Sequence, residues 1–175
     1  YPADPERLAA TRGALEWPEP QVALGLALRG IAHAAIDISD GLLQDLGHIL
    51  AASRVGAVLH EDRLPAAAAL AGLPADALRR AVLGGGDVYQ LCFTAPAARR
   101  DAVLAAARTA GARVTRVGGI VAHDPAQDAM QASAVTHTGG SSEIPGAARP
   151  RLVVLDATGQ PLAQLPAGFD HFPGA

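Results

Sequence analysis

The chain has 175 residues, of which 50% are hydrophobic and only 3% aromatic, and its formal net charge is −3. A chain of this length suits a single domain with an aliphatic core, and it buries roughly 70% of the surface that its unfolded form exposes. The net charge offers no electrostatic basis for binding nucleic acid, which normally requires a clustered basic face. No apolar run reaches the roughly 18 residues of a membrane span and no signal peptide is recognisable, so we expect a cytoplasmic protein without a membrane partner.

The basic residues are all arginine, because the sequence contains no lysine. This excludes a P-loop, whose lysine reaches the phosphates of a nucleotide, and it excludes Schiff-base chemistry on lysine. The single cysteine, Cys92, lies in an apolar run and is typical of a small buried hydrophobe rather than of a nucleophile. One cysteine cannot form an internal disulfide, which fits a reducing compartment.

Apolar periodicity predicts alternating helices and strands along the chain. Asp4 and Pro5 are residue types that favour the start of a helix, so we expect the first helix to begin there. Gly72 and Pro74 are expected to break an alanine-rich helical segment into two pieces. Residues 123–150 are rich in polar residues and glycine, and we expect them to form an exposed, flexible insertion. A short helix is expected within 1–15, and further helices are expected over 21–29, 41–53, 66–82 and 97–110. The expected strands cover 33–36, 55–60, 89–94, 114–121 and 151–156. Such alternation predicts an α/β fold with a mixed β-sheet packed with helices.

The most informative stretch runs from Asp37 to Leu42, where an apolar strand ends in two carboxylates and a hydroxyl and a helix begins at once. We expect Ser39 or Asp40 to cap that helix through a side-chain oxygen. In one interpretation this is only a strand, a capped turn and a helix. In the other, Asp37 and Asp40 hold Mg²⁺ while backbone N–H groups and the Ser39 hydroxyl face a phosphate.

Two further polar features carry possible chemistry. Gly84-Gly85-Gly86-Asp87 is either a tight turn between a helix and a strand or a loop whose backbone approaches a ligand closely. Near the end of the chain, Phe169 and Phe172 flank Asp170-His171, and these aromatic rings either dock on the core or stack on a cationic heterocycle.

Three motifs together resemble those of thiamine-monophosphate kinase. They are HAAIDISDGLLQDLGHI at 33–49, GGDVYQLCFT at 85–94 and GFDHF at 168–172, in the order and spacing of that family. The D-x-S-D-G motif alone marks only the wider superfamily that includes aminoimidazole ribonucleotide synthetase and selenophosphate synthetase.

The resemblance extends over residues 1–175 as one domain, and it corresponds to the C-terminal half of such a kinase. It implies the mixed β-sheet packed with helices of that C-terminal domain. It also implies ATP- and Mg²⁺-dependent phosphorylation of thiamine monophosphate to thiamine diphosphate by a homodimeric full-length enzyme. The family's N-terminal metal and ATP domain has no counterpart here, so the chain is either a fragment or a lone domain, and we expect it to be inactive or nearly so by itself.

By resemblance, Asp37 and Asp40 are expected to ligate Mg²⁺ and Ser39 to contact the nucleotide. Asp87 and Phe169 are expected to contact the substrate, Phe169 through the thiamine ring. The absence of lysine agrees with a kinase that has no P-loop.

The second motif departs from the family, which usually reads Gly-Gly-Glu-Asp-Tyr-Glu-Leu. Asp87 replaces the first glutamate, Val88 the aspartate and Gln90 the second glutamate. These replacements leave open two alternatives: a divergent, non-catalytic domain that binds a nucleotide or a protein partner, or another ATP-using enzyme of the superfamily.

Overall fold

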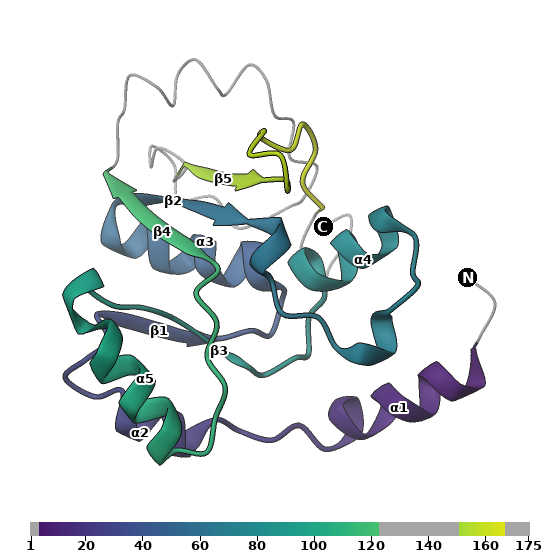
Figure 1. Cartoon of the computed structure of the whole chain (residues 1–175), viewed down its shortest axis with the longest axis horizontal. Helices are drawn as coiled ribbons and strands as arrows, with labels where there is room; N and C mark the ends of the chain where they lie inside the picture. The colour runs from purple at the N-terminus through teal and green to yellow at the C-terminus, as the bar shows by residue number, and fades with distance from the viewer. Residues whose placement is uncertain (1–3, 123–150, 167–175) are drawn as a thin grey trace, which may run out of the picture.

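Two small β-sheets with helices packed beside them make up this computed structural model, which describes residues 4–122 and 151–166 (Figure 1). The predicted α/β fold with a mixed sheet is confirmed. The predicted insertion at 123–150 lies outside the described residues.

The first sheet joins β1 (Ala34–Asp37) and β3 (Leu91–Thr94) as an antiparallel pair. Asp37 lies opposite Leu91 at the end of this ladder. Backbone hydrogen bonds continue past the end of both strands, from Ile38 N to the Gln90 carbonyl and from Tyr89 N to the Ile38 carbonyl, each at 2.9 Å. The segment that follows β1 is therefore tied to the segment that precedes β3.

The second sheet is the mixed one. Its central strand β2 (Val55–His60) runs antiparallel to β4 (Gly118–Ala122) and parallel to β5 (Leu152–Leu155). The bounds of β2 are those predicted from its apolar run.

Helix α3 (Leu42–Ser53) packs against both sheets and supplies most of the main core. Its apolar side chains recur every three or four residues, which gathers them on one helix face. Leu83 of α4 (Ala75–Gly84) and Val154 of β5 complete this core at 0% and 1% exposure. Arg79 of α4 donates two hydrogen bonds to Glu61 just after β2, at 2.7 and 3.1 Å, which helps to fix α4 and the glycines at its end.

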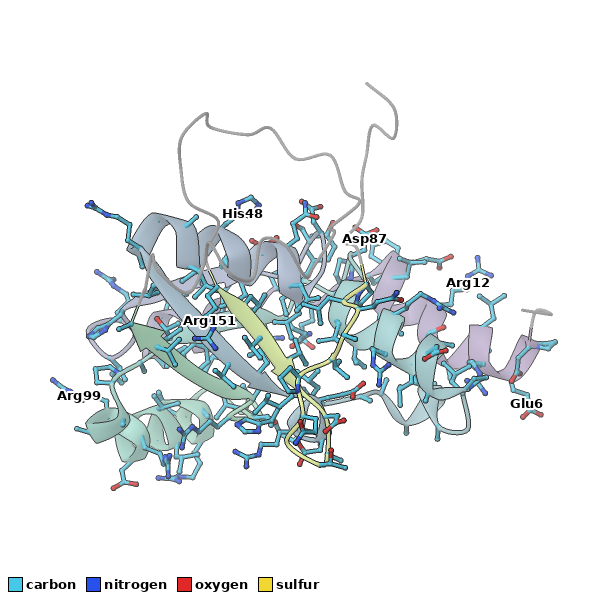
Figure 2. The ribbon with its side chains drawn as sticks, turned by 90° about the horizontal axis from the view of Figure 1, so that it is seen from above. Glu6, Arg12, His48, Asp87, Arg99 and Arg151 are labelled. Carbon is cyan, nitrogen blue, oxygen red and sulfur yellow. The ribbon has the colours of Figure 1, made fainter. Side chains whose placement is uncertain are left out.

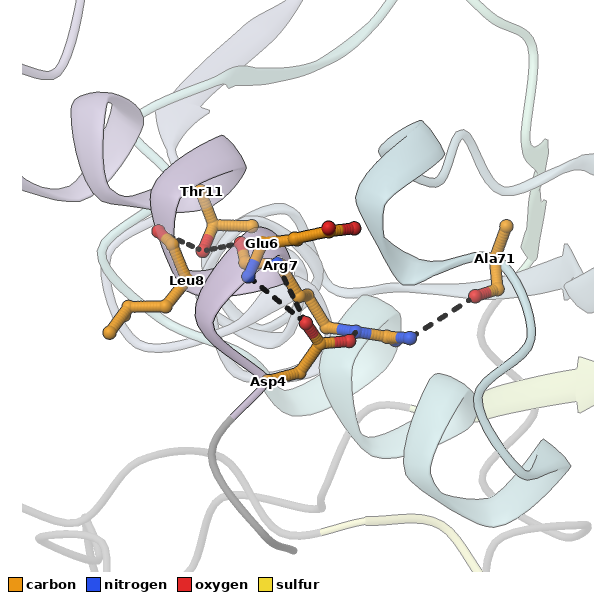
Figure 3. Close-up of polar contacts among 6 residues, drawn as sticks. All are labelled: Asp4, Glu6, Arg7, Leu8, Thr11 and Ala71. Carbon is orange, nitrogen blue, oxygen red and sulfur yellow. Dashed lines mark hydrogen bonds and ion pairs between the residues drawn. The ribbon is translucent and has the colours of Figure 1, made fainter.

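A second, smaller core lies under β3, where α2 (Val22–Ala27) and α5 (Arg100–Thr109) pack together (Figure 1). Helix α1 (Pro5–Glu16) buries no side chain. Its link to the rest of the chain includes a hydrogen bond of 3.4 Å from Arg7 Nη2 to the carbonyl of Ala71 (Figure 3). Short 3-10 turns cover Glu61–Arg63, Ala68–Leu70 and Ala97–Arg99.

Several boundaries differ from those predicted. The strand expected from residue 89 begins at Leu91 because Tyr89 takes a positive φ of 51°, which strand backbone does not allow. The strand expected over 114–121 begins only at Gly118 and extends to Ala122. The predicted break of the alanine-rich segment is confirmed, since a 3-10 turn and α4 flank Gly72 and Pro74. In the described parts of the chain, no helix is both long and apolar enough to cross a membrane.

Candidate functional site

The turn after β1 reaches helix α3 through Gly41, which is the N-cap residue and has a φ of 110°. No side chain caps the first turn of α3, so the prediction that Ser39 or Asp40 would cap this helix is wrong. A positive φ of this kind favours glycine, because a Cβ would clash with the backbone. The chain direction is thus changed by Gly41, and neither polar side chain is used to begin the helix.

A buried carboxylate inside α3 stabilises the turn instead. Asp45 is only 2% exposed, and its Oδ2 atom accepts hydrogen bonds from the backbone N–H groups of Ser39 at 3.0 Å and Asp40 at 3.1 Å. Sequence reasoning did not single out Asp45. A signal existed, because Asp45 lies three residues after Leu42 and four before Ile49, on the apolar face of the helix, where a charged residue is unusual.

The triple glycine allows a second segment to approach this turn closely. The N–H of Asp87 donates to the carbonyl of Ser39 at 2.8 Å. A Cβ on Gly86 would lie 2.4 Å from the Ser39 carbonyl oxygen, and one on Gly41 would lie 2.8 Å from the Gly84 carbonyl oxygen. Both distances are too short for a real Cβ, so the glycines let the backbone of the turn after β1 and that of the loop before β3 interlock, that is, pack in direct contact. Residues 85–90 form a loop rather than a tight turn, and what their glycines allow is a close backbone contact with the turn after β1.

Asp87 and Tyr89 both have left-handed backbone conformations, with φ values of 56° and 51°. The Tyr89 hydroxyl donates a hydrogen bond of 3.1 Å to Asp87 Oδ1. This bond is the main cause that raises the pKa of Tyr89, and the negative charges of Asp87, Asp37 and Asp40 add to it. The three predicted carboxylates therefore act on one hydroxyl, at one end of the two-stranded sheet.

The predicted metal ligands lie at the surface of this end. Asp37 is exposed, whereas Ser39 and Asp40 are half-buried, and Gln44 Nε2 donates to Asp40 Oδ2 at 3.3 Å. Within the described residues, no group of three or more His, Cys, Asp or Glu side chains could hold a metal ion. Mg²⁺ commonly binds one or two protein carboxylates and completes its octahedron with waters and substrate phosphates. Two aspartates on one fixed turn fit that pattern as part of a site.

A hollow of about 350 Å³ lies beside Asp37. Its wall is mainly apolar, and the polar residues in it are Gln21, Asp37 and Tyr89. It is lined by Pro18, Pro20, Gln21, Val22, Asp37, Tyr89 and Leu91.

Cys92 lies next to the site but takes no part in its polar face. Burial raises the pKa of its thiol to about 11, and the negative charge of Asp45 contributes to this rise. The thiol therefore stays protonated at neutral pH, and its side chain packs against the main core. The predicted role of Cys92 as a small hydrophobe agrees with both observations.

Phe169 and the rest of the GFDHF motif lie outside the described residues. The structure thus brings Asp37, Ser39, Asp40 and Asp87 together and describes no position for the predicted aromatic contact.

Comparison with known proteins relates this arrangement to one family. The family model described as AIR synthase related protein, C-terminal domain, matches residues 6–127. The thiamine-monophosphate kinase of Salmonella typhimurium is 48% identical over 103 residues, which cover 58% of this chain and 31% of that protein.

Solved structures give the same relationship. The crystal structure of thiamine-monophosphate kinase from Stenotrophomonas maltophilia superposes with a TM-score of 0.63 at 46% identity, over 69% of this chain and 38% of that one. AaThiL, solved in complex with AMPPCP and TMP, has a TM-score of 0.63 at 21% identity, over 98% of this chain and 44% of that one, and it supports the fold alone. The matched region makes up less than half of each relative.

Proposed function

Because the chain belongs to the AIR synthase related protein, C-terminal domain family, we propose that it is the C-terminal half of a kinase that transfers a phosphoryl group from ATP to thiamine monophosphate. The product is thiamine diphosphate. The observation that carries this proposal is the interlocked pair of motifs at 37–41 and 84–89, in a domain 46% identical to a thiamine-monophosphate kinase of known structure.

Asp37 and Asp40 are the proposed Mg²⁺ ligands. They are hard oxygen donors three residues apart on a turn whose backbone is held from two sides. When bound, Mg²⁺ would neutralise the negative charge of the phosphates. Transfer between two anions depends on positioning and charge neutralisation more than on covalent chemistry, so a rigid turn bearing two carboxylates suits the reaction.

Ser39 is the proposed nucleotide contact, and Asp87 and Phe169 are the proposed substrate contacts. The Ser39 backbone is bonded through both its N–H and its carbonyl, which leaves its hydroxyl as the group that can meet a phosphate. Asp87 is exposed, and its carboxylate accepts from Tyr89, beside the hollow that adjoins Asp37.

This half of the site is proposed to be incomplete without a second domain. Two carboxylates from one turn supply only part of the charge that two phosphorylated substrates require, and no larger ligand group occurs in residues 4–122 and 151–166. We therefore expect an N-terminal domain to supply further acidic ligands and the rest of the ATP site, in a cytoplasmic homodimer. The 175-residue chain alone should form little or no thiamine diphosphate.

The test is the substitution Asp37→Asn in the protein at its full natural length, assayed for thiamine diphosphate formed from thiamine monophosphate and ATP. Loss of a metal carboxylate should lower kcat by about 100-fold or more, beyond the effect usual for a residue that only supports a ligand. Asp101→Asn on α5 makes the same chemical change at an exposed position and should leave kcat unchanged. Figure 2 shows Arg99, two residues earlier, well separated from Asp87. Wild-type turnover by Asp37→Asn would remove this residue from the metal site.

The replacements at 87, 88 and 90 favour a second candidate, a divergent domain that binds a nucleotide without catalysis. Asp87 is one methylene shorter than the usual glutamate and is engaged by the Tyr89 hydroxyl, while Val88 is 44% exposed where the family carries a charge. Calorimetry with Mg²⁺ and ATP on the full-length protein, combined with the assay of turnover, separates the two candidates. Binding of nucleotide together with no turnover of thiamine monophosphate would favour the second.

A further inference from the structure

We propose that Asp45 is a positioning residue for the metal and nucleotide groups of the turn. Its buried carboxylate accepts from the backbone N–H groups of Ser39 and Asp40 and so fixes the turn that carries Asp37, Ser39 and Asp40. The inference rests on the proposed function for what these side chains bind, and on the hydrogen bonds of Asp45 for how they are held.

The burial of Asp45 is the first argument. Among residues 4–122 and 151–166, Asp45 is the one polar or charged residue classed as buried, and it lies among the leucines of α3. Burying a carboxylate is costly unless it is hydrogen-bonded. Here a single oxygen, Oδ2, receives two backbone N–H groups at 3.0 and 3.1 Å, and such charge-assisted bonds are stronger than neutral ones.

The position of the two donors is the second argument. Ser39 and Asp40 come before α3, whereas an ordinary capping carboxylate satisfies donors inside its own helix. Asp45 thus adds little to the start of the helix, which Gly41 already directs. What Asp45 fixes is the loop that carries the candidate ligands.

The third argument is what this arrangement does to Ser39. Its N–H is bonded to Asp45 on one side, and its carbonyl is bonded to Asp87 N at 2.8 Å on the other. The peptide groups on both sides of Ser39 are therefore held by hydrogen bonds, one to α3 and one to the loop before β3. Gly41 is the N-cap residue, so the start of α3 does not depend on the Ser39 hydroxyl or on the Asp40 carboxylate, which accepts from Gln44 Nε2 at 3.3 Å.

Asp45→Ala and Asp45→Asn in the full-length protein test the proposal. The alanine leaves both N–H groups without their acceptor, whereas the asparagine keeps an amide oxygen that can accept but has lost the charge. Supporting a metal ligand typically affects metal affinity or activity about 10- to 100-fold. We expect Asp45→Ala to lower kcat within that range and to raise the Mg²⁺ concentration that gives half the maximal rate, with Asp45→Asn partly restoring both.

Val154→Ala is the control for a merely structural role. Val154 is 1% exposed in β5, in the other sheet, so its truncation should lower the melting temperature without touching the turn. Assayed at a temperature where all variants are folded, Val154→Ala should keep kcat within about twofold of wild type. Hydrogen exchange of the segment 38–41 should accelerate in Asp45→Ala and not in Val154→Ala. If Asp45→Ala keeps the rate and the Mg²⁺ dependence of Val154→Ala, the proposal is overturned.

Failure of the kinase assignment is distinguishable from failure of this proposal. If the wild-type protein transfers no phosphoryl group, the same variants are compared for Mn²⁺ binding by electron paramagnetic resonance. Affinity about 10-fold weaker in Asp45→Ala supports a positioning role. Equal affinity, or no binding of Mn²⁺ by the wild type, overturns it.

Discussion

At the starts of α1 and α3, two carboxylates each accept hydrogen bonds from two backbone N–H groups, as Asp156 also does in the turn after β5. Asp4 precedes α1, and its Oδ1 atom accepts from Glu6 and Arg7 inside the helix, each at 3.1 Å (Figure 3). Asp45 lies within α3, and its Oδ2 atom accepts from Ser39 and Asp40 before the helix. The Asp4 side chain is 48% exposed, whereas Asp45 is 2% exposed as a residue.

Asp4 and Asp45 both accept from backbone N–H groups, but they have different roles because the positions of the donors and the burial of the carboxylates differ. Asp4 caps the helix that follows it, in a helix with no buried side chain, and so its influence is local. Asp45 links the core face of α3 to the turn that bears Asp37 and Asp40, and so its influence is tertiary. When Asp4 is removed, the N–H groups that it capped can bind water at an exposed helix start, whereas the N–H groups that Asp45 bonds belong to the half-buried residues Ser39 and Asp40.

The largest expected effect is on the free energy of unfolding of Asp45→Ala. Each buried N–H left without an acceptor costs about 1–3 kcal/mol, so we expect the variant to lose about 2–5 kcal/mol. Urea unfolding followed by circular dichroism measures this loss. A loss no greater than that of Asp4→Ala would remove the distinction between the two carboxylates.

A smaller loss is expected from Gly86→Ala, which tests the interlock between the turn and the loop before β3. The added Cβ would meet the Ser39 carbonyl oxygen at 2.4 Å, so one backbone segment must move, at a cost of about 1–3 kcal/mol.

Gly47→Ala in α3 is the matched control for Gly86→Ala. Nothing lies within 4 Å of a Cβ at that position, and alanine is the better helix former by about 0.5–1 kcal/mol. We therefore expect the control to be more stable than wild type in the same urea experiment. Equal stability of the two variants would argue against close packing at Gly86.

The smallest expected effect is that of Asp4→Ala, and it should depend on pH. The backbone N–H of Arg7 is the main cause that lowers the pKa of Asp4 below its ordinary value of 3.8. A carboxyl group with a lowered pKa in the folded state stabilises the fold above the unfolded pKa, and this contribution is lost as the pH falls through the folded pKa.

The difference in melting temperature between wild type and Asp4→Ala should therefore be small at pH 7 and should shrink further as the pH falls below 3.8. Thermal unfolding followed by circular dichroism at a series of pH values measures it. A difference that grew on acidification would contradict the capping role.

Features that depend on neighbours in the chain were predictable from sequence. The start of α1 at Pro5 after Asp4, the bounds of β2 and the break at Gly72 and Pro74 follow from local propensities, and all three are confirmed. The motif at 37–41 also identified the family, because its residue types and spacing are specific when the companion motifs accompany them.

Features that depend on segments far apart in the chain were decided by packing. The close approach of Gly41 to Gly84, the late start of β3 at Leu91 and the close approach of Gly86 to Ser39 all require the loop before β3 to lie against the turn after β1. The bounds of α3 itself lie within one residue of the predicted 41–53. Asp45 shows the same dependence on packing at shorter range, because Ser39 and Asp40 are only six and five residues away in the chain. Its residue type and its place on an apolar helix face could be seen in the sequence, but the two amides that it bonds are brought to it only when β1 and α3 fold back on each other.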